Sequence, residues 1–500
     1  MPKSYIRRIL QSHVYDVAKV TPLDTARQLS TKLGNTVYLK REDLQPIFSF
    51  KIRGAYNKIM TLSPTQLAAG VIAASAGNHA QGVAFSAHRL GIHATIVMPK
   101  TTPAIKIKPV RNYGAKTILH GNNYNEAYDF AVQLAIEKGY TFVHPYDDPD
   151  VIAGQGTVGM ELLRQTRHID AIFVPVGGGG LIAGIAAYVK YVDPKIKVIG
   201  VEPIDAACLY EAMKANERVI LSEVGNFVDG VAVKQIGEET FRIAQTCVDD
   251  VITVSNDEVC AAIQDIFEDT RAIAEPAGAL ALAGLKRYVQ THEIRDRHLV
   301  AILSGANINF HRLQHISERA EIGEGREGLL AVTIPEHPGS FKTFCKTLGA
   351  RGITEFNYRY NDPAQAVVFV GIETHEHERS AVIQALVDHE FKVEDLSENE
   401  IAKLHIRHMV GGRKPVTDER LFHFEFPERP GALMNFLNKI GNQRNISLFH
   451  YRNHGADYGR VLAGIQIPDA DYAEFISRLE TIGYPFRDET ENPVYRLFLV

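Results

Sequence analysis

The stretch AIFVPVGGGGLIAGIAAYV, residues 171–189, contains no charged side chain along its whole length. A membrane-spanning helix needs about 20 apolar residues, so length alone would fit one. Pro175 and the glycine run 177–180 would break such a helix in its middle. A buried strand, a glycine loop and a helix in succession account for every residue, so we predict an α/β unit here and no membrane span.

Short apolar runs alternate with helical stretches on both sides of this segment. Alternation of this kind is typical of parallel strands joined by crossover helices. We therefore predict one α/β region over residues 1–320. Its expected strands are residues 71–75, 94–98, 116–120, 141–145, 172–176, 197–203 and 298–305.

Length and charge narrow the class of protein. A chain of 500 residues exceeds what one hydrophobic core usually supports, so two or three domains are expected. The formal net charge of -5 is small and no dense run of Lys and Arg occurs, which argues against nucleic acid or a membrane as a partner. We expect chemistry on small molecules.

The cysteines are scattered and form no CxxC pair, which argues against a disulfide framework and against a zinc site. We predict no site for any other metal ion either. The N-terminus interrupts its apolar residues with charges and lacks the apolar core of a secretion signal, so a cytoplasmic location is expected. We interpret the four cysteines as buried apolar side chains: Cys208, Cys247, Cys260 and Cys345.

A stretch rich in charge and glycine marks a boundary after residue 320. This stretch, ERAEIGEGREG at residues 318–328, cannot bury much surface, and we place a linker at 321–328. Beyond the linker the sequence repeats itself. EHPGSF at 336–341 returns as ERPGAL at 428–433, and ITEFNYR at 353–359 returns as ISLFHYR at 446–452.

The repeat predicts two related modules, residues 329–415 and 416–500. Each reads as a strand, a Pro-Gly turn, a helix, an aromatic-rich strand and a further strand, which is typical of an α+β, ferredoxin-like unit. Such a unit leaves a sheet edge and a helix face uncovered, so we expect the two modules to pair side by side. The alternative is a duplicated structural appendage that binds no ligand.

Lys51 lies in the hexapeptide SFKIRG, residues 49–54. A buried lysine loses its proton more easily than an exposed one, and only the neutral amine attacks an aldehyde. Phe50 offers apolar shielding, Gly54 allows close backbone approach, and a helix is expected to begin near the lysine. A lone lysine is more often a charged side chain on the surface. The hypothesis that Lys51 binds an aldehyde therefore depends on the two candidate anion-binding segments described next.

The glycine run is the first of these segments. Gly177, Gly178, Gly179 and Gly180 leave a strand and enter a helix from Leu181, so their amide hydrogens can surround a phosphate at a positive helix end. The run lacks the GxGxxG spacing of dinucleotide sites, although Glu202 is a nearby carboxylate and keeps that alternative open.

The segment SAGNHAQG, residues 75–82, is the second. It lies between an expected strand and an expected helix and presents free amides and a hydroxyl, which suits the carboxylate of an amino acid. The residues concerned are Ser75, Ala76, Gly77, Asn78 and His79. As alternatives, Asn78 is a helix cap and His79 a core histidine.

Together with LSGAN at 303–307, these motifs resemble the fold-type II pyridoxal phosphate enzymes, and among them the threonine ammonia-lyase family, over nearly all of residues 1–320. The resemblance implies a catalytic domain of the tryptophan synthase β type with pyridoxal 5'-phosphate as cofactor. Lys51 would hold the cofactor aldehyde, Asn78 would bond the ring hydroxyl, and Ser304 would face the pyridine nitrogen. The phosphate would lie on Gly177, Gly178, Gly179, Gly180 and Leu181.

The same resemblance implies β-elimination of L-threonine to 2-oxobutanoate and ammonia, and of L-serine to pyruvate, with Lys51 as the general base. The C-terminal modules resemble the ACT-like regulatory domains of the biosynthetic members, which make the first committed precursor of isoleucine. Isoleucine would then be an inhibitor, valine an activating antagonist, and the protein a homotetramer. We expect the effectors near the turns Pro338, Gly339 and Pro430, Gly431.

Two classes of alternative remain. Serine racemase, threonine synthase and cysteine synthase share the lysine and the glycine loop, although the repeated tail speaks against them. A protein that only senses amino acids, with a degenerate catalytic region, is the non-enzymatic alternative, and the intact Lys51 and Ser304 speak against it.

Overall fold

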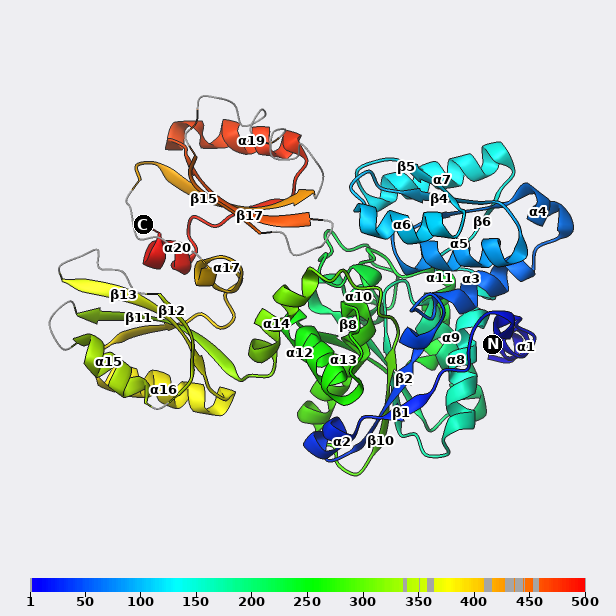
Figure 1. Ribbon diagram of the computed structural model, residues 1–500, viewed down its shortest axis with the longest axis horizontal. Helices are drawn as coiled ribbons and strands as arrows, with labels where there is room; N and C mark the ends of the chain where they lie inside the picture. The colour runs from blue at the N-terminus through cyan, green and yellow to red at the C-terminus, as the bar shows by residue number, and fades with distance from the viewer. Residues whose placement is uncertain are drawn as a thin grey trace. The chain divides into compact units, whose positions relative to one another are not determined.

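The computed structural model describes residues 2–335, 340–349, 351–357, 364–408, 416–427, 436, 444, 446–452 and 458–499. The chain divides into two compact units, Met1–Phe310 and His311–Val500 (Figure 1). Each unit has its own sheets and helices, and each is described by itself.

The larger sheet of the first unit has the strand order β1-β2-β10-β7-β8-β9. All neighbouring strands run parallel except β1 and β2. A parallel sheet is covered on both faces, which explains why every residue of the apolar β7 is buried. Its strands are β1 (Leu23–Thr25), β2 (Thr36–Arg41), β7 (Ala171–Pro175), β8 (Lys197–Pro203), β9 (Asp250–Val254) and β10 (His298–Leu303).

The smaller sheet of this unit is parallel throughout, in the order β5-β4-β3-β6. Alternate residues of β3 face opposite layers: Val71 and Ala73 pack with α3 and α5, and Ile72 and Ala74 pack with α7. Figure 1 shows α7 on one side of the sheet and α5 and α6 on the other. The strands are β3 (Val71–Ala74), β4 (Ala94–Met98), β5 (Lys116–Leu119) and β6 (Thr141–Phe142).

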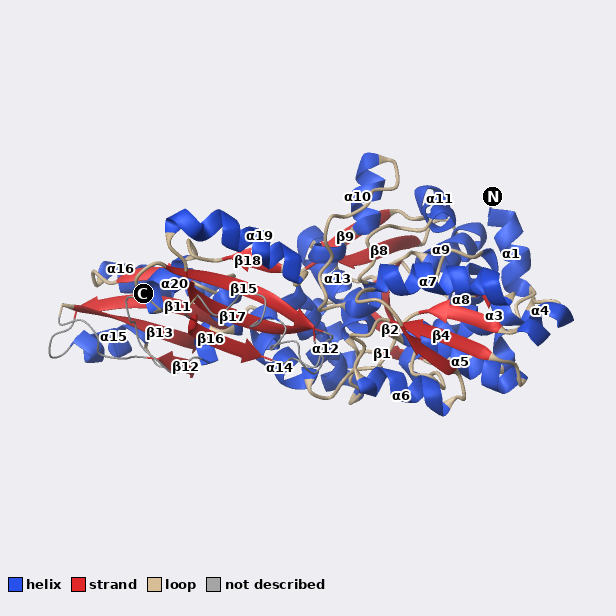
Figure 2. Cartoon of the chain, turned by 90° about the horizontal axis from the view of Figure 1, so that it is seen from above, coloured by secondary structure: helices blue, strands red, loops and turns tan. Residues whose placement is uncertain are grey.

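Helices cover both sheets of the first unit, as Figure 2 shows. Helices α1, α8, α9 and α11 share one core with the larger sheet, and α13 contacts β7, β8, β9 and β10. The helices are α1 (Pro2–Leu10), α2 (Arg27–Leu33), α3 (Lys51–Met60), α4 (Pro64–Ala69), α5 (Asn78–Leu90), α6 (Ala104–Asn112), α7 (Tyr124–Lys138), α8 (Pro149–Gln165), α9 (Gly180–Val192), α10 (Cys208–Ala215), α11 (Glu238–Cys247), α12 (Asn256–Thr270) and α13 (Pro276–His292).

Every strand predicted in the first unit is present, but the predicted strand 141–145 is too long. It ends at Phe142, because Nδ1 of His144 accepts the amides of Tyr146 and Asp147 and so turns the chain. Residues 171–189 form β7, a loop and the start of α9, as predicted. Among the described residues, no helix is long and apolar enough to cross a membrane.

The second unit contains two four-stranded antiparallel sheets with the orders β12-β13-β11-β14 and β16-β17-β15-β18. Both orders are those of a ferredoxin-like βαββαβ unit, which confirms the predicted duplication. The strands are β11 (Glu327–Pro335), β12 (Ile353–Asn357), β13 (Gln365–Glu373), β14 (Lys392–Asp395), β15 (Glu419–Pro427), β16 (Ile446–Arg452), β17 (Tyr458–Gln466) and β18 (Phe486–Asp488). The helices are α14 (Arg312–Gly323), α15 (Ser340–Leu348), α16 (Glu376–Asp388), α17 (Glu400–Leu404), α19 (Tyr472–Ile482) and α20 (Pro493–Phe498).

Two sequence-based expectations differ from the structure. The expected linker 321–328 contains the end of α14 and the start of β11, and the two compact units divide between Phe310 and His311. Within this stretch Arg326 pairs with Glu321 and Glu324, and Glu327 is buried in β11, where it pairs with Arg407. Of the four cysteines, Cys345 is exposed and not buried, since it lies on the outer face of α15.

A buried cluster of two acids and two bases lies in the core of the first unit. Arg53 donates from Nη2 to Oε1 of Glu42 at 2.8 Å and from Nη1 to Oε1 of Glu161 at 2.6 Å, and Nζ of Lys40 donates to Oε2 of Glu161 at 2.6 Å. Burial disfavours the ionised form of Glu42, but the Arg53 guanidinium outweighs it and lowers the pKa of that carboxyl. The cluster joins β2, α3 and α8, and so fixes the helix that begins at Lys51.

Replacing Arg53 with Met should destabilise the fold strongly. The substitution leaves the buried Glu42 carboxylate without its ion-pair partner and removes one of the two cations that hold Glu161, and a loss of about 3–5 kcal/mol is typical of a broken buried pair. The matched control is Arg8→Met, whose ion pair with Asp150 is solvent-exposed and whose loss should cost about 1 kcal/mol or less. Thermal and denaturant unfolding of both variants measures the difference, and equally small losses in both would contradict the assignment.

Candidate active site

The predicted site residues gather at the carboxyl ends of parallel strands. Ser75 directly follows β3, the glycine run follows β7, and Ser304 follows β10. Crevices at the carboxyl ends of parallel strands are where ligands bind in open α/β sheets. Both sheets of the first unit therefore contribute residues to the candidate site. Lys51 is the first residue of α3.

The Lys51 amine is enclosed. Its Nζ donates to the carbonyl oxygen of Pro145 at 2.8 Å and lies 5.3 Å from the centre of the Phe50 ring, as expected of a shielding side chain. Desolvation by burial lowers the pKa of Lys51 to about 8. The amine therefore loses its proton far more readily than an ordinary lysine, and its neutral form can act as a nucleophile or a base.

The backbone of the glycine loop, residues 177–180, is in close contact with neighbouring residues. A Cβ built on Gly178 would lie 2.2 Å from the ring of Tyr146, and Gly179 has φ +89°, so neither position accommodates a side chain. Helix α9 begins at Gly180 and turns its first amides toward the loop. Bare backbone at a helix N-terminus suits a phosphate group.

The segment 75–79 forms a second turn at the N-terminus of a helix. The Ser75 hydroxyl accepts the amide of Gly77 at 3.2 Å, and α5 begins at Asn78. The side chain of Asn78 does not cap this helix. Its Nδ2 donates to Glu275 at 2.6 Å and its Oδ1 accepts from Asn307 at 2.6 Å, so the amide is held at both ends.

His79 is buried and neutral. Its Nε2 lies 2.8 Å from the carbonyl oxygen of Val143, whereas Nδ1 has no hydrogen-bond partner among the described residues. Burial, and then the nearby charge of Lys51, lower the pKa of His79 to about 3. If His79 is a core histidine, its contact with Val143 explains the position of Nε2 but leaves Nδ1 unexplained.

Ser304 is buried beside the segment that carries the lysine. Its carbonyl oxygen accepts the amide of Phe50 at 3.2 Å, and its hydroxyl lies 3.1 Å from the carbonyl oxygen of Ala277. Ser49 and Gly305 pair in an isolated antiparallel bridge. The two motifs SFKIRG and LSGAN are thus joined through their backbones.

Some residues of the site were missed by the sequence analysis. Glu275 and Asn307 hold Asn78, and Pro145 and Tyr146 contact Lys51 and Gly178. Asn307 lies inside the quoted LSGAN motif, which was the available signal. A backbone carbonyl such as that of Pro145 has no signature in a sequence.

Glu202, which kept the dinucleotide alternative open, is engaged elsewhere. Its Oε1 accepts the amide of Leu209 at 2.8 Å and its Oε2 that of Tyr210 at 2.7 Å, so it caps α10. Burial raises the pKa of Glu202 to about 8 in spite of these amides. A buried carboxylate with both oxygens occupied cannot bind a ribose.

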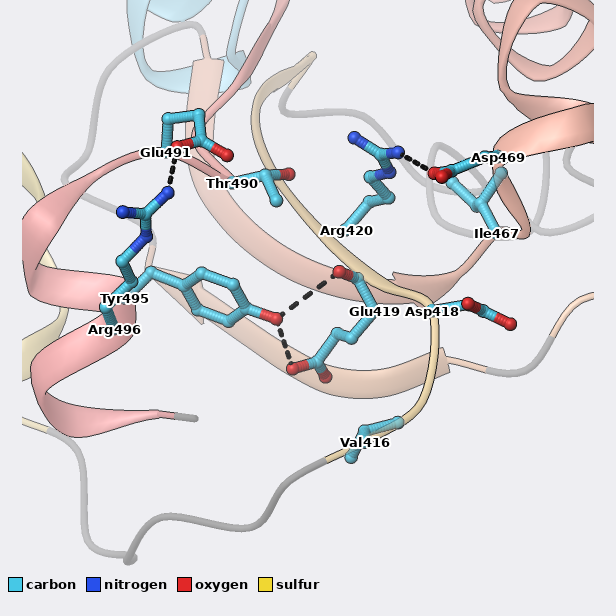
Figure 3. A pocket seen from close by; sticks show the side chains of 10 residues that line it. All are labelled: Val416, Asp418, Glu419, Arg420, Ile467, Asp469, Thr490, Glu491, Tyr495 and Arg496. Carbon is cyan, nitrogen blue, oxygen red and sulfur yellow. Dashed lines mark hydrogen bonds and ion pairs between the residues drawn. The ribbon is translucent and has the colours of Figure 1, made fainter.

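Outside the region around Lys51, we assign no ligand site in the described parts of the chain. No group of three or more His, Cys, Asp and Glu residues there is arranged to hold a metal ion. The second unit has a hollow of about 320 Å³. Figure 3 shows the side chains that line it, among which Arg420 pairs with Asp469 and Arg496 with Glu491. A charged ligand would have to displace one of these pairs, so we assign none.

The residues of the first unit fit pyridoxal phosphate. The cofactor needs a lysine amine for its aldehyde, a cradle for its phosphate and polar groups around its ring. The structure offers Lys51, the side-chain-free loop 177–180 at the start of α9, and the polar side chains of Asn78 and Ser304.

Comparison with known proteins agrees with this fit. The family of pyridoxal-phosphate dependent enzymes matches residues 14–305, and the C-terminal regulatory domain of threonine dehydratase matches 318–406 and again 410–499. The chain is 57% identical to the biosynthetic L-threonine dehydratase IlvA of Pasteurella multocida, over 99% of this chain and 97% of that protein.

Solved structures are similar to part of the chain. Threonine deaminase isoform 2 of Solanum lycopersicum, in its processed form, has 48% identity and a TM-score of 0.63 over 64% of this chain and 93% of its own. Serine racemase of maize has 32% identity and a TM-score of 0.59 over 62% of this chain and 95% of its own. The chain belongs to the pyridoxal-phosphate dependent enzymes, and within them to the biosynthetic threonine dehydratases that carry two C-terminal regulatory domains.

Proposed function

We propose that this protein converts L-threonine to 2-oxobutanoate and ammonia, and L-serine to pyruvate and ammonia, as the first step of isoleucine biosynthesis. The observation that carries the proposal is a Lys51 amine of lowered pKa, placed among two helix N-termini that suit a phosphate and a carboxylate. Bound pyridoxal phosphate supplies an aldehyde that condenses with the substrate amine and a ring that takes up the electron pair left at Cα.

The chain itself supplies binding, orientation and proton transfer. Residues 177–181 hold the phosphate on bare backbone, and residues 75–79 hold the substrate carboxylate at the start of α5. Asn78 would orient the ring through its hydroxyl group and Ser304 through its pyridine nitrogen. Asn78 can do so because Glu275 and Asn307 fix its amide.

Lys51 removes the Cα proton as the general base, for which a pKa near the working pH is favourable. The β-hydroxyl takes up a proton, which balances the one removed from Cα, and leaves as water. The released 2-aminocrotonate isomerises and takes up water to give 2-oxobutanoate and ammonia, so the water lost is balanced by the water consumed. Serine follows the same route without the methyl group.

The alternatives within this fold are less well supported. The match to serine racemase covers 62% of the chain, whereas the match to threonine dehydratase covers 99% and includes both regulatory domains. Threonine synthase and cysteine synthase share the lysine and the glycine loop, but not this repeated tail. A degenerate amino acid sensor would not need a lysine amine of lowered pKa.

The regulatory domains point to control by an end product. We propose isoleucine as the inhibitor and valine as its activating antagonist, in a cytoplasmic homotetramer. The turns Pro338, Gly339 and Pro430, Gly431, near which the effectors were expected, lie outside the described residues.

The test of the activity is direct. Purified protein supplied with pyridoxal phosphate and L-threonine should release a keto acid and ammonia in equal amounts, and Lys51→Ala should release neither, because the base and the cofactor attachment are lost. Borohydride reduction followed by peptide mapping should locate the cofactor on Lys51. Cofactor found on another lysine would overturn the site, and absence of keto acid from the wild type would overturn the function.

The pKa of Lys51 should be visible in cofactor capture. Only the neutral amine attacks the aldehyde, so the rate at which cofactor-free protein takes up pyridoxal phosphate should rise with pH, with a midpoint near the pKa of about 8. Absorbance measured after stopped-flow mixing reports the rate at each pH. A midpoint near 10.5, the ordinary value for lysine, would show that the amine is not desolvated.

Removal of the second unit should separate activity from control. A protein that ends at Phe310 should still turn over threonine but should lose inhibition by isoleucine, because the regulatory domains are gone. Initial rates with and without isoleucine give the comparison, and bound cofactor shows that the shortened protein is folded. Undiminished inhibition of the shortened protein would place the effector site in the first unit.

A further inference from the structure

The turn that follows β6, residues 144–147, is held rigidly between the two sheets of the first unit. On one side, Nδ1 of His144 accepts the amides of Tyr146 at 3.3 Å and Asp147 at 2.8 Å. On the other side, the Asp147 carboxylate accepts the amides of Glu238 and Glu239 at 2.9 Å each, at the start of α11. The turn therefore has little freedom to move.

This turn fixes the ring of Tyr146 against the glycine loop. A Cβ on Gly178 would lie 2.2 Å from the ring, and one on Gly180 would lie 3.0 Å from the Tyr146 backbone. The His144 ring meets the Tyr146 ring edge to face, with centroids 4.7 Å apart. Tyr146 thus forms one wall of the site, with its ring packed between His144 and Gly178.

The reacting amine lies beside this wall. The carbonyl oxygen of Pro145, the residue directly before Tyr146, accepts from Nζ of Lys51 at 2.8 Å. A base in that position takes the proton from Cα, and the β-carbon of the substrate is one bond further away. Tyr146 is therefore the side chain of this turn that adjoins both the glycine loop and the carbonyl that binds the base.

We propose that Tyr146 contacts the γ-methyl group of threonine and makes the site prefer threonine to serine. This inference rests on the proposed function. Contact with an aromatic ring removes the methyl group from water, which stabilises bound threonine. Serine lacks this methyl group and gains no such stabilisation.

The surroundings of the ring are suited to an apolar contact. Burial lowers the pKa of His144 to about 4 and raises the pKa of Tyr146, so both rings are uncharged near neutral pH. One methyl group is worth at least about 10-fold in discrimination in an apolar pocket. A preference of that size is therefore expected from this one wall.

The experiment compares kcat/KM for L-threonine and L-serine in the full-length holoenzyme. Tyr146→Ala should lower the threonine-to-serine ratio about 10-fold, because the wall is lost. Tyr146→Phe keeps the ring and should keep the ratio. Tyr128→Ala is the matched control, since Tyr128 meets His144 from α7, with ring centroids 6.1 Å apart, and should leave the ratio unchanged.

Each outcome is decisive. A ratio that stays at the wild-type value in Tyr146→Ala, while the cofactor is bound, would overturn the inference and would leave the proposed function intact. If Tyr146→Ala does not hold the cofactor, Tyr146→Leu retains apolar bulk against Gly178, and a smaller fall in the ratio is expected from it. Wild-type protein that acts on neither amino acid would defeat the proposed function itself.

Discussion

A buried amine that can lose its proton is the constraint on which this site depends. A carboxylate in contact with Lys51 would raise the pKa of the amine and keep it charged. The structure gives Nζ a backbone carbonyl instead, that of Pro145, which accepts a hydrogen bond without adding a full negative charge. The neighbouring His79 and His144 have lowered pKa values and stay neutral. Desolvation is then the dominant influence on the amine, and its pKa falls.

The acids of this region are engaged by other donors, and this keeps them from the lysine. Asp147 accepts amides of α11, Glu202 accepts amides of α10, and Glu275 accepts from the side chain of Asn78. Asp147 and Glu202 sit at helix N-termini, where the amides of α11 and α10 occupy their oxygens, although burial still raises the pKa of Glu202.

A feature of the fold or the site could be predicted from the sequence when it depends on residues close together in the chain. The strands, the glycine loop and the segment 75–79 are local patterns, and parallel strands bring their carboxyl ends together without further information. The contact of Lys51 with Pro145 spans 94 residues and uses a carbonyl, and the contact of Asn78 with Glu275 spans 197 residues. Nothing local marks such pairs. The expected linker 321–328 failed for the same reason, because its Glu327 is buried in β11 and pairs with Arg407, 80 residues away.

The duplicated tail shows how two small domains complete one another. β12 and β16 both carry a register shift, at Ile353/Glu355 and at Ile446/Leu448, so the repeat preserves even a local irregularity of pairing. The modules then share one apolar core, to which the first contributes β11 and α17 and the second contributes β15, β17 and α20. Phe498 of α20 packs on Phe369 of β13 with ring centroids 5.6 Å apart, so the last helix of the chain lies on the sheet of the first module. Close-packed cores resist continuous deformation. A ligand that shifted the strands of one module would therefore also displace those of the other.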